Sequence, residues 1–130
     1  MLRTEEPKVA SIERQDFCDS ITLDFSHANL SHACISNGVL YGANLTMADL
    51  SYTILESCSL SETNLSGATF AGTIIGYEFD LTQANLTDVD LSQAMIELPG
   101  GIDNPRIKGA ILRNTILPDG TKVIFSLLPF

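Results

Sequence analysis

The chain has 130 residues, of which 45% are hydrophobic and 18% charged, and its formal net charge is −9. A chain of this length can bury about two thirds of its unfolded surface, enough for one continuous core. Its acidity repels nucleic acid and anionic membranes, whose binding depends on basic residues, so neither is expected as a partner. No apolar run approaches the ~18 residues of a membrane span, and residues 1–7 do not resemble a secretory leader, so the cytoplasm is the expected compartment.

Residues 1–19 lack a regular pattern and are expected to cap the N-terminal end of the domain. Two interpretations of this segment remain open. Residues 4–7 (Thr-Glu-Glu-Pro) resemble the start of a short helix, since proline is tolerated in a first turn. Alternatively, residues 10–12 and 15–17 are degenerate units of the repeat that follows.

From residue 25 onward an apolar side chain falls at every fifth position. These central residues are Phe25, Leu30, Ile35, Leu40, Leu45, Leu50, Leu55, Leu60, Leu65, Phe70 and Ile75, followed after one inserted residue by Leu81, Leu86, Leu91 and Ile96. Five residues turn an α-helix by about 500°, so they form no single stripe. On a flat strand an odd spacing alternates between the two faces. The pattern therefore predicts a solenoid whose chain turns a corner every five residues.

The neighbours of the central residues support this prediction. Two positions earlier the residue is usually small, as at Ala43 and Ala48, which suits a second inward position beside a large side chain. One position earlier Asp or Asn recurs, as at Asn44 and Asp49, and such side chains bond to nearby backbone and favour turns. The two residues after each centre are mostly small or polar and are expected to form exposed corners.

Units such as Ala-Asn-Leu-Ser-His at 28–32, and those at 43–47, 48–52 and 84–88, resemble the A-(D/N)-L-x-x unit of pentapeptide-repeat proteins. The resemblance covers about residues 20–98 and, more weakly, 105–119, and residues 114–121 resemble tails common among cyanobacterial members. It implies an all-β, right-handed quadrilateral β-helix with four units per coil and about four to five coils. Family membership implies little about activity.

Four units per coil place residues 20 apart in one column. The predicted columns are Phe25/Leu45/Leu65/Leu86, Leu30/Leu50/Phe70/Leu91, Ile35/Leu55/Ile75/Ile96 and Leu40/Leu60/Leu81. The extra residue is expected to bulge near residues 76–79. Phe79 then occupies an inward position whose counterparts are small, so either the bulge makes room for it or the local register differs. The predicted organisation is an N-terminal cap (1–19), the β-helix (20–98), and a loop with degenerate repeats and an apolar cap (99–130).

The corners allow a prediction about turn type. A type II turn needs a positive φ at its second central residue, which favours Gly or Asn. Asn37, Gly42, Gly67 and Gly72 satisfy this at the second position after a centre. The other corners are therefore expected to be type I or irregular; they include Thr46-Met47, Ser51-Tyr52, Glu56-Ser57, Thr82-Gln83 and Ser92-Gln93.

Beyond residue 98 the sequence Pro-Gly-Gly at 99–101 breaks the coil, and units reappear at Ile107, Leu112 and Leu117. Residues 123–130 are too apolar for a free tail. They are expected either to cover the last coil or to form a weak homodimer contact through this end.

Cysteine and histidine offer no expected catalytic, cofactor or metal site. Three cysteines without a leader argue against a disulfide framework: Cys58 is expected to be a small inward filler, Cys34 lies on a neighbouring wall, and Cys18 precedes the repeat. His27 and His32 occupy equivalent corners, which is no metal-ligand set. The Asp residues before the centres recur with the repeat and are expected to be structural. We therefore predict a protein that is not an enzyme and binds no cofactor.

Charge is the feature that points to a partner. Between Gln15 and Pro105 there are twelve acidic residues and no Lys or Arg, a surface able to attract a basic protein or simply to keep the solenoid in solution. The best candidates for such a binding surface are acids that do not occupy the repeat's turn position, namely Glu56, Glu62, Glu78, Asp88 and Glu97. We predict a protein-interaction or scaffold module with an unidentified protein partner. The family implies an alternative, an acidic DNA mimic that binds a type II topoisomerase, as its quinolone-resistance members do; four coils rise only about 19 Å, short of the ~34 Å of one DNA turn.

Overall fold

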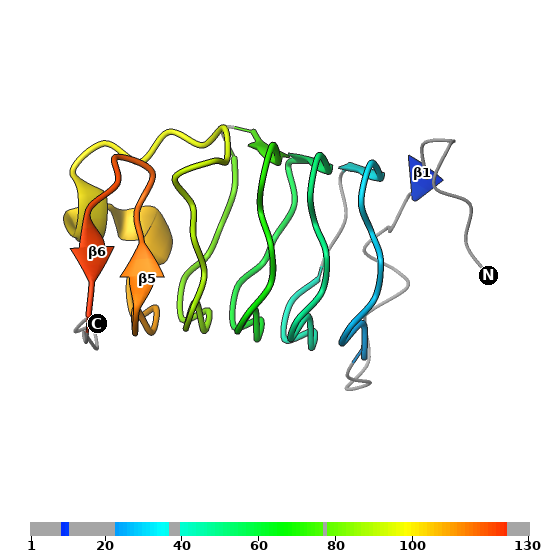
Figure 1. The fold of residues 1–130 in the computed structure, drawn as a ribbon, viewed down its shortest axis with the longest axis horizontal. Helices are drawn as coiled ribbons and strands as arrows, with labels where there is room; N and C mark the ends of the chain where they lie inside the picture. The colour runs from blue at the N-terminus through cyan, green and yellow to red at the C-terminus, as the bar shows by residue number, and fades with distance from the viewer. Residues whose placement is uncertain (1–8, 11–22, 37–39, 77, 125–130) are drawn as a thin grey trace.

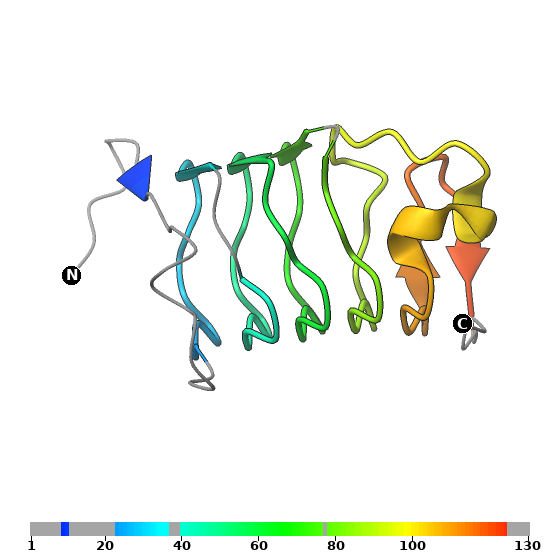
Figure 2. The ribbon, with the colours of Figure 1, turned by 180° about the vertical axis from the view of Figure 1, so that it is seen from behind.

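The computed structural model describes residues 9–10, 23–36, 40–76 and 78–124. The chain winds in coils stacked along one axis, and the view from behind shows the same stack (Figures 1 and 2). This is the all-β, right-handed quadrilateral β-helix that the family resemblance implies. Walls 1 to 4 are named here by the central residues stacked in them. Wall 1 holds Phe25, Leu45, Leu65, Leu86 and Leu112; wall 2 Leu30, Leu50, Phe70, Leu91 and Leu117; wall 3 Ile35, Leu55, Ile75 and Ile96; wall 4 Leu40, Leu60, Leu81 and Ile107.

Wall 3 carries a continuous parallel sheet. Its strands are β1 (Val9–Ala10), β2 (Cys34–Ser36), β3 (Ile54–Glu56) and β4 (Ile74–Ile75), paired in that order. Ala10 pairs with Ile35 and so lies in the ladder of the repeat. The helix start expected at residues 4–7 lies outside the described residues. Apart from Ala10, so do the degenerate units expected at residues 10–12 and 15–17.

The predicted columns are confirmed by the pairing. Cys34 pairs with Ile54 and Ile54 with Ile74, so the spacing is 20 residues. It becomes 21 at Ser59 and Asp80, which places the extra residue between Ile75 and Asp80. Phe79 then points inward and is buried. The register therefore holds around this aromatic side chain.

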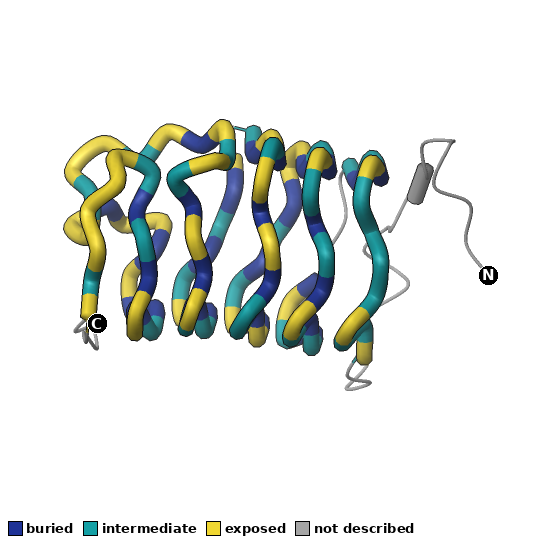
Figure 3. The backbone as a smooth tube through the Cα atoms, in the orientation of Figure 1, coloured by how far each residue is buried: buried dark blue, intermediate teal, exposed yellow. Residues whose placement is uncertain are grey.

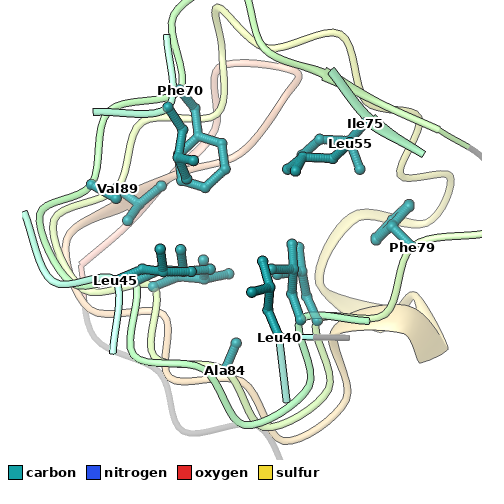
Figure 4. Close-up of a cluster of buried hydrophobic side chains, with 14 of the residues drawn as sticks. Leu40, Leu45, Leu55, Phe70, Ile75, Phe79, Ala84 and Val89 are labelled. Carbon is teal, nitrogen blue, oxygen red and sulfur yellow. The ribbon is translucent and has the colours of Figure 1, made fainter. Parts of the chain in front are cut away.

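Two inward side chains per unit fill the core. Leu50, Leu60 and Leu81 are each at most 1% exposed, and the inward faces stay buried along the rod (Figures 3 and 4). Some small inward positions hold threonine, which needs a hydrogen-bond partner when buried. Thr73 Oγ1 donates to the Leu50 carbonyl at 2.6 Å, joining neighbouring walls across the interior.

The corner prediction is wrong at most of the glycine-free corners. Positive φ values occur at Met47, Tyr52, Ser57 and Gln83, between 50° and 60°. Turn bonds such as Ala48 N–H to Leu45 C=O, 3.0 Å, close the corners at Met47, Tyr52 and Gln83, so these have the positive φ of a type II turn. Of the corners named above, Ser92-Gln93 keeps a negative φ, as expected.

Hydrogen bonds between coils explain these strained corners. The Met47 N–H donates to the Ser66 carbonyl of the next coil at 2.9 Å, and the Tyr52 N–H donates to Ala71 in the same way. A left-handed conformation costs a non-glycine residue about 1–2 kcal/mol. The positive φ allows each of these N–H groups to reach the carbonyl of the next coil, so the stacked coils favour the conformation that sequence alone disfavours.

The recurring Asp and Asn residues stabilise the same corners. Asn44 Oδ1 accepts hydrogen bonds from the Thr46 N–H at 3.0 Å and from the Thr46 hydroxyl at 2.6 Å. Equivalent bonds occur on walls 1, 2 and 4, for example at Asp80 and Asp90. The expected turn function of these side chains is confirmed.

After Ile96 the chain leaves the coil through two 3₁₀ helices, η2 (Gly101–Asp103) and η3 (Pro105–Ile107), and then resumes stacking. β5 (Thr115–Ile116) continues wall 2, and β6 (Lys122–Val123) pairs antiparallel with its outer edge. Val123 packs against the core, so the described part of the apolar C-terminal segment covers the last coil. Residues 125–130 lie outside the description, and the homodimer contact stays a prediction.

Candidate interaction surface

An apolar stripe runs along the outside of wall 3. The position that most often holds Asp or Asn on the other walls is occupied here by Cys34, Ile54, Ile74 and Met95, which pair in sequence along the ladder. Ile74 is 40% exposed and Met95 64% exposed. Sequence analysis missed this stripe. Its signal was available: in the third column, the residue before each centre is apolar at every turn of the coil.

The stripe ends in a groove of about 630 Å³ where the fourth coil leaves the ladder. The Met95 N–H still donates to the Thr73 carbonyl, at 2.7 Å. Two residues later the chain departs toward η2 and η3, so the gap between the coils opens. The groove is lined by Ile74, Ile75, Gly76, Phe79, Ala94, Met95, Ile96, Glu97, Pro99, Asn104, Arg106 and Pro118.

Arg106 is the cation of this groove, and its position depends on Asn104. The Asn104 side chain caps η3 by accepting from the Arg106 N–H at 2.8 Å, and it donates to the Pro99 carbonyl at 2.8 Å. The Arg106 side chain turns back, donates to the Phe79 carbonyl and lies over the Phe79 ring, 5.2 Å from its centroid. This loop residue was also missed by sequence analysis, because nothing in the repeat places it beside Phe79.

Three of the five candidate acids gather at the corner beside the stripe. Glu56 and Glu97 each follow a central residue of wall 3, as expected, and both are exposed. Glu78 accepts a hydrogen bond from the Ser57 hydroxyl at 3.2 Å, which places it next to Glu56. The stripe, the groove and these three acids are called the wall-3 surface below.

The other two acids lie on different corners. Asp88 accepts a hydrogen bond from Asn114 Nδ2 at 2.8 Å. Glu62 accepts from the Tyr41 hydroxyl, and this bond raises the pKa of Tyr41. The structure therefore does not bring all five predicted acids into one patch.

Among the described residues no histidine or cysteine lines the groove, although Cys34 begins the stripe on wall 3. The His32 ring stacks on Tyr52 with 5.1 Å between centroids. Cys58 is buried, which raises its pKa to about 11, so its thiol is protonated at neutral pH. Among the described residues no group of three or more His, Cys, Asp or Glu side chains is arranged to hold a metal ion. The absence of cofactor and catalytic residues remains a prediction.

The four-unit coil with one apolar centre every five residues defines a quadrilateral repeat solenoid. The family model for pentapeptide repeats matches residues 24–61 and 43–75, with 8 copies. Residues 24–75 therefore consist of pentapeptide repeats. No curated protein matches it significantly. No helix in the described ranges is long and apolar enough to cross a membrane.

The chain is also similar to solved structures. A pentapeptide repeat protein of the Arabidopsis thaliana thylakoid lumen is 24% identical, with a TM-score of 0.55 over 72% of this chain; the match spans 63% of that protein's length. Rfr23 from the cyanobacterium Cyanothece 51142 is 21% identical, with a TM-score of 0.43, over 84% of this chain and 69% of its own. QnrB1, a plasmid-mediated fluoroquinolone resistance protein, is 19% identical, with a TM-score of 0.39, over 95% of this chain and 79% of its own.

Proposed function

We propose that this chain is a non-enzymatic protein-interaction module that binds a protein partner through the wall-3 surface. The observation that carries the proposal is the replacement of the turn-forming Asp and Asn by an apolar stripe on this wall. These exposed apolar side chains cannot make the turn hydrogen bonds that Asp and Asn make at this position. An exposed apolar patch rimmed by polar residues is typical of a binding site. The expected compartment of the protein is the cytoplasm, and its expected oligomeric state is a monomer or a weak homodimer.

The rim determines the chemistry of the partner. Glu56, Glu78 and Glu97 lie beside the apolar stripe, so a partner with an apolar anchor flanked by Lys or Arg is complementary. Exposed charges are screened by salt, with a Debye length of about 8 Å at physiological ionic strength. Binding is therefore expected to weaken as salt is added.

The test is capture of partner proteins from cell extract by the tagged full chain, compared with two charge variants. Reversal of Glu56, Glu78 and Glu97 to Lys should abolish capture. Reversal of Glu62 and Asp88 to Lys is the matched control and should leave capture intact, because these acids lie on other corners. Equal capture by both variants, or capture that is insensitive to salt, would leave solubility as the better account of the acidic surface.

The second candidate function is the acidic DNA mimic that binds a type II topoisomerase. The run from Gln15 to Pro105 without Lys or Arg favours it. The apolar stripe beside the three acids disfavours it, since a duplex presents charged phosphates along both edges of its grooves. A gyrase supercoiling assay decides: inhibition by the full chain that is lost on reversal of acids on every corner would support the mimic over wall-3 binding.

A further inference from the structure

The hydrogen-bond ladder is continued on two walls beyond the fourth coil. On wall 1 the Ala84 carbonyl and Leu86 N–H both bond to Ile111 at 2.9 Å. On wall 2 the Val89 carbonyl and Leu91 N–H both bond to Ile116, at 2.9 and 2.8 Å. Each wall of the fourth coil thus presents one carbonyl and one N–H, two residues apart, to the coil that follows.

On wall 3 the equivalent groups are the Ala94 carbonyl and the Ile96 N–H. Neither makes a main-chain hydrogen bond within the described part of the chain. The reason lies in the path after Leu117: the chain turns at Asp119–Gly120 and returns as β6 along β5, so the residues described up to 124 build no fifth rung on wall 3. β6 lies beside β5 and so pairs with wall 2 (Figure 1), while among the described residues no main-chain group pairs with the edge formed by Ala94 and Ile96.

We propose that an extended segment of the partner protein adds to this edge as a β-strand, paired with Ala94–Ile96. This inference rests on the proposed function and specifies how the wall-3 surface binds. A partner N–H donates to the Ala94 carbonyl, and a partner carbonyl accepts from the Ile96 N–H, as Ile116 does on wall 2. Strand addition to an exposed edge obtains affinity from such main-chain bonds and specificity from pockets for alternate side chains.

The side chains around the edge define the segment. A strand sends alternate side chains to opposite faces. One outward side chain lies over the stripe beside Met95, whose exposed thioether is an adaptable apolar contact. The carboxylate of Glu97, at the end of the edge and in the groove lining, is complementary to a Lys or Arg of the segment. The occupant is therefore an extended segment with a large apolar residue and a basic residue nearby.

The experiment uses the full chain and a random 12-residue peptide library displayed on phage. Selected peptides are synthesised, and amide hydrogen exchange is measured by NMR with and without each peptide. In the free protein the Ile96 amide should exchange at least about tenfold faster than the ladder-bonded amides of Leu86 and Leu91. Selected peptides should contain an apolar and a basic residue and should slow exchange at Ile96.

Two controls test the main-chain pairing. N-methylation of the peptide amide that donates to Ala94 should weaken binding by at least about tenfold, because it removes the donor and keeps the side chains. Glu97→Lys should weaken binding, and Glu62→Lys, on another corner, should not. Selection of no peptide at this edge, unchanged Ile96 exchange on peptide binding, or equal binding of the N-methylated peptide would overturn the proposal.

A second copy of the chain is the competing occupant. Concentration-dependent protection of Ile96 without peptide, with a dimer in sedimentation, would replace the partner segment by self-association. The proposed function is judged separately through stripe variants Ile74→Asp and Met95→Asp. Loss of partner capture in these variants without Ile96 protection in the complex would keep the wall-3 surface and reject strand addition. Unchanged capture would reject both.

Discussion

The Arg106 guanidinium bonds to the Phe79 carbonyl with an Nη1···O distance of 2.6 Å, in the place where the ladder would otherwise supply a main-chain donor. On wall 1 the Ala84 carbonyl accepts from the Ile111 N–H of the next coil. At Phe79 that donor is lost, because the Arg106 N–H is turned to Asn104 by η3. The Arg106 carbonyl stays in the ladder and accepts from the Leu81 N–H at 2.9 Å, and the Arg106 side chain replaces the donor that its own N–H no longer supplies.

Arg106→Ala should therefore destabilise the fold. The Phe79 carbonyl would lose its donor and the Phe79 ring its cation, at a combined cost of about 1–3 kcal/mol in unfolding free energy. Lys108→Ala, an exposed cation two residues away, is the control and should change stability by about 0.5 kcal/mol or less. Chemical denaturation measures both. Equal stability of the two variants would show that the Arg106 contacts contribute nothing.

Alanine substitutions in the core should lower the free energy of unfolding more than alanine substitutions of the turn-forming acids. Leu50→Ala or Leu60→Ala removes a fully buried side chain from a stacked column and should cost about 2–5 kcal/mol. Asp49→Ala removes the acceptor for the Ser51 N–H and the Thr69 hydroxyl and should cost about 1 kcal/mol, with the fold intact. Thermal unfolding followed by circular dichroism compares them. If Leu60→Ala melts at the wild-type temperature while Asp49→Ala is unfolded, the assignment of inward and outward positions is wrong.

Two glutamines test the strained corners. Gln83 and Gln93 occupy equivalent corner positions, but Gln83 has a φ of 59° and Gln93 has a negative φ. Glycine relieves the left-handed strain at the first site and only loosens the unfolded chain at the second. Gln83→Gly should thus be more stable than Gln93→Gly by about 1 kcal/mol, measured by urea denaturation. The reverse order would contradict ladder-imposed strain.

Stability should fall at alkaline pH through Cys58. Burial raises the pKa of this thiol from 9.0 to about 11, so the folded state favours the protonated form. Its contribution is fully present below pH 9, where the unfolded thiol is also protonated, and is lost as the pH rises through about 11.

Cys58→Ala isolates this effect, because alanine fills equivalent inward positions such as Ala48 and Ala84. The difference in unfolding free energy between wild type and variant should shrink by on the order of 2 kcal/mol from pH 9 to pH 11. Melting temperatures across this range provide the measurement. A difference that does not vary with pH would show that the thiol titrates alike in both states.

The period of five, by itself, determined the coil. A large apolar residue at every fifth position can reach a common core only if the chain turns a corner in each unit, and the turn function of Asn44 and its equivalents follows from the same spacing. Cys58 is an inward filler for the same reason. The four walls, and with them the columns through Leu50 and Leu60, were implied by the family resemblance and are confirmed by the pairing.

Tertiary structure decided what depends on neighbouring coils. The left-handed φ of Tyr52 follows from an N–H held by the next coil, which outweighs the preference of a single residue. The contact between Arg106 and Phe79 joins residues 27 apart across an irregular loop, and the open edge at Ile96 exists because β6 returns along β5. The spacing of five predicts one coil and its stacking on the next, but it does not predict where the stack of coils ends.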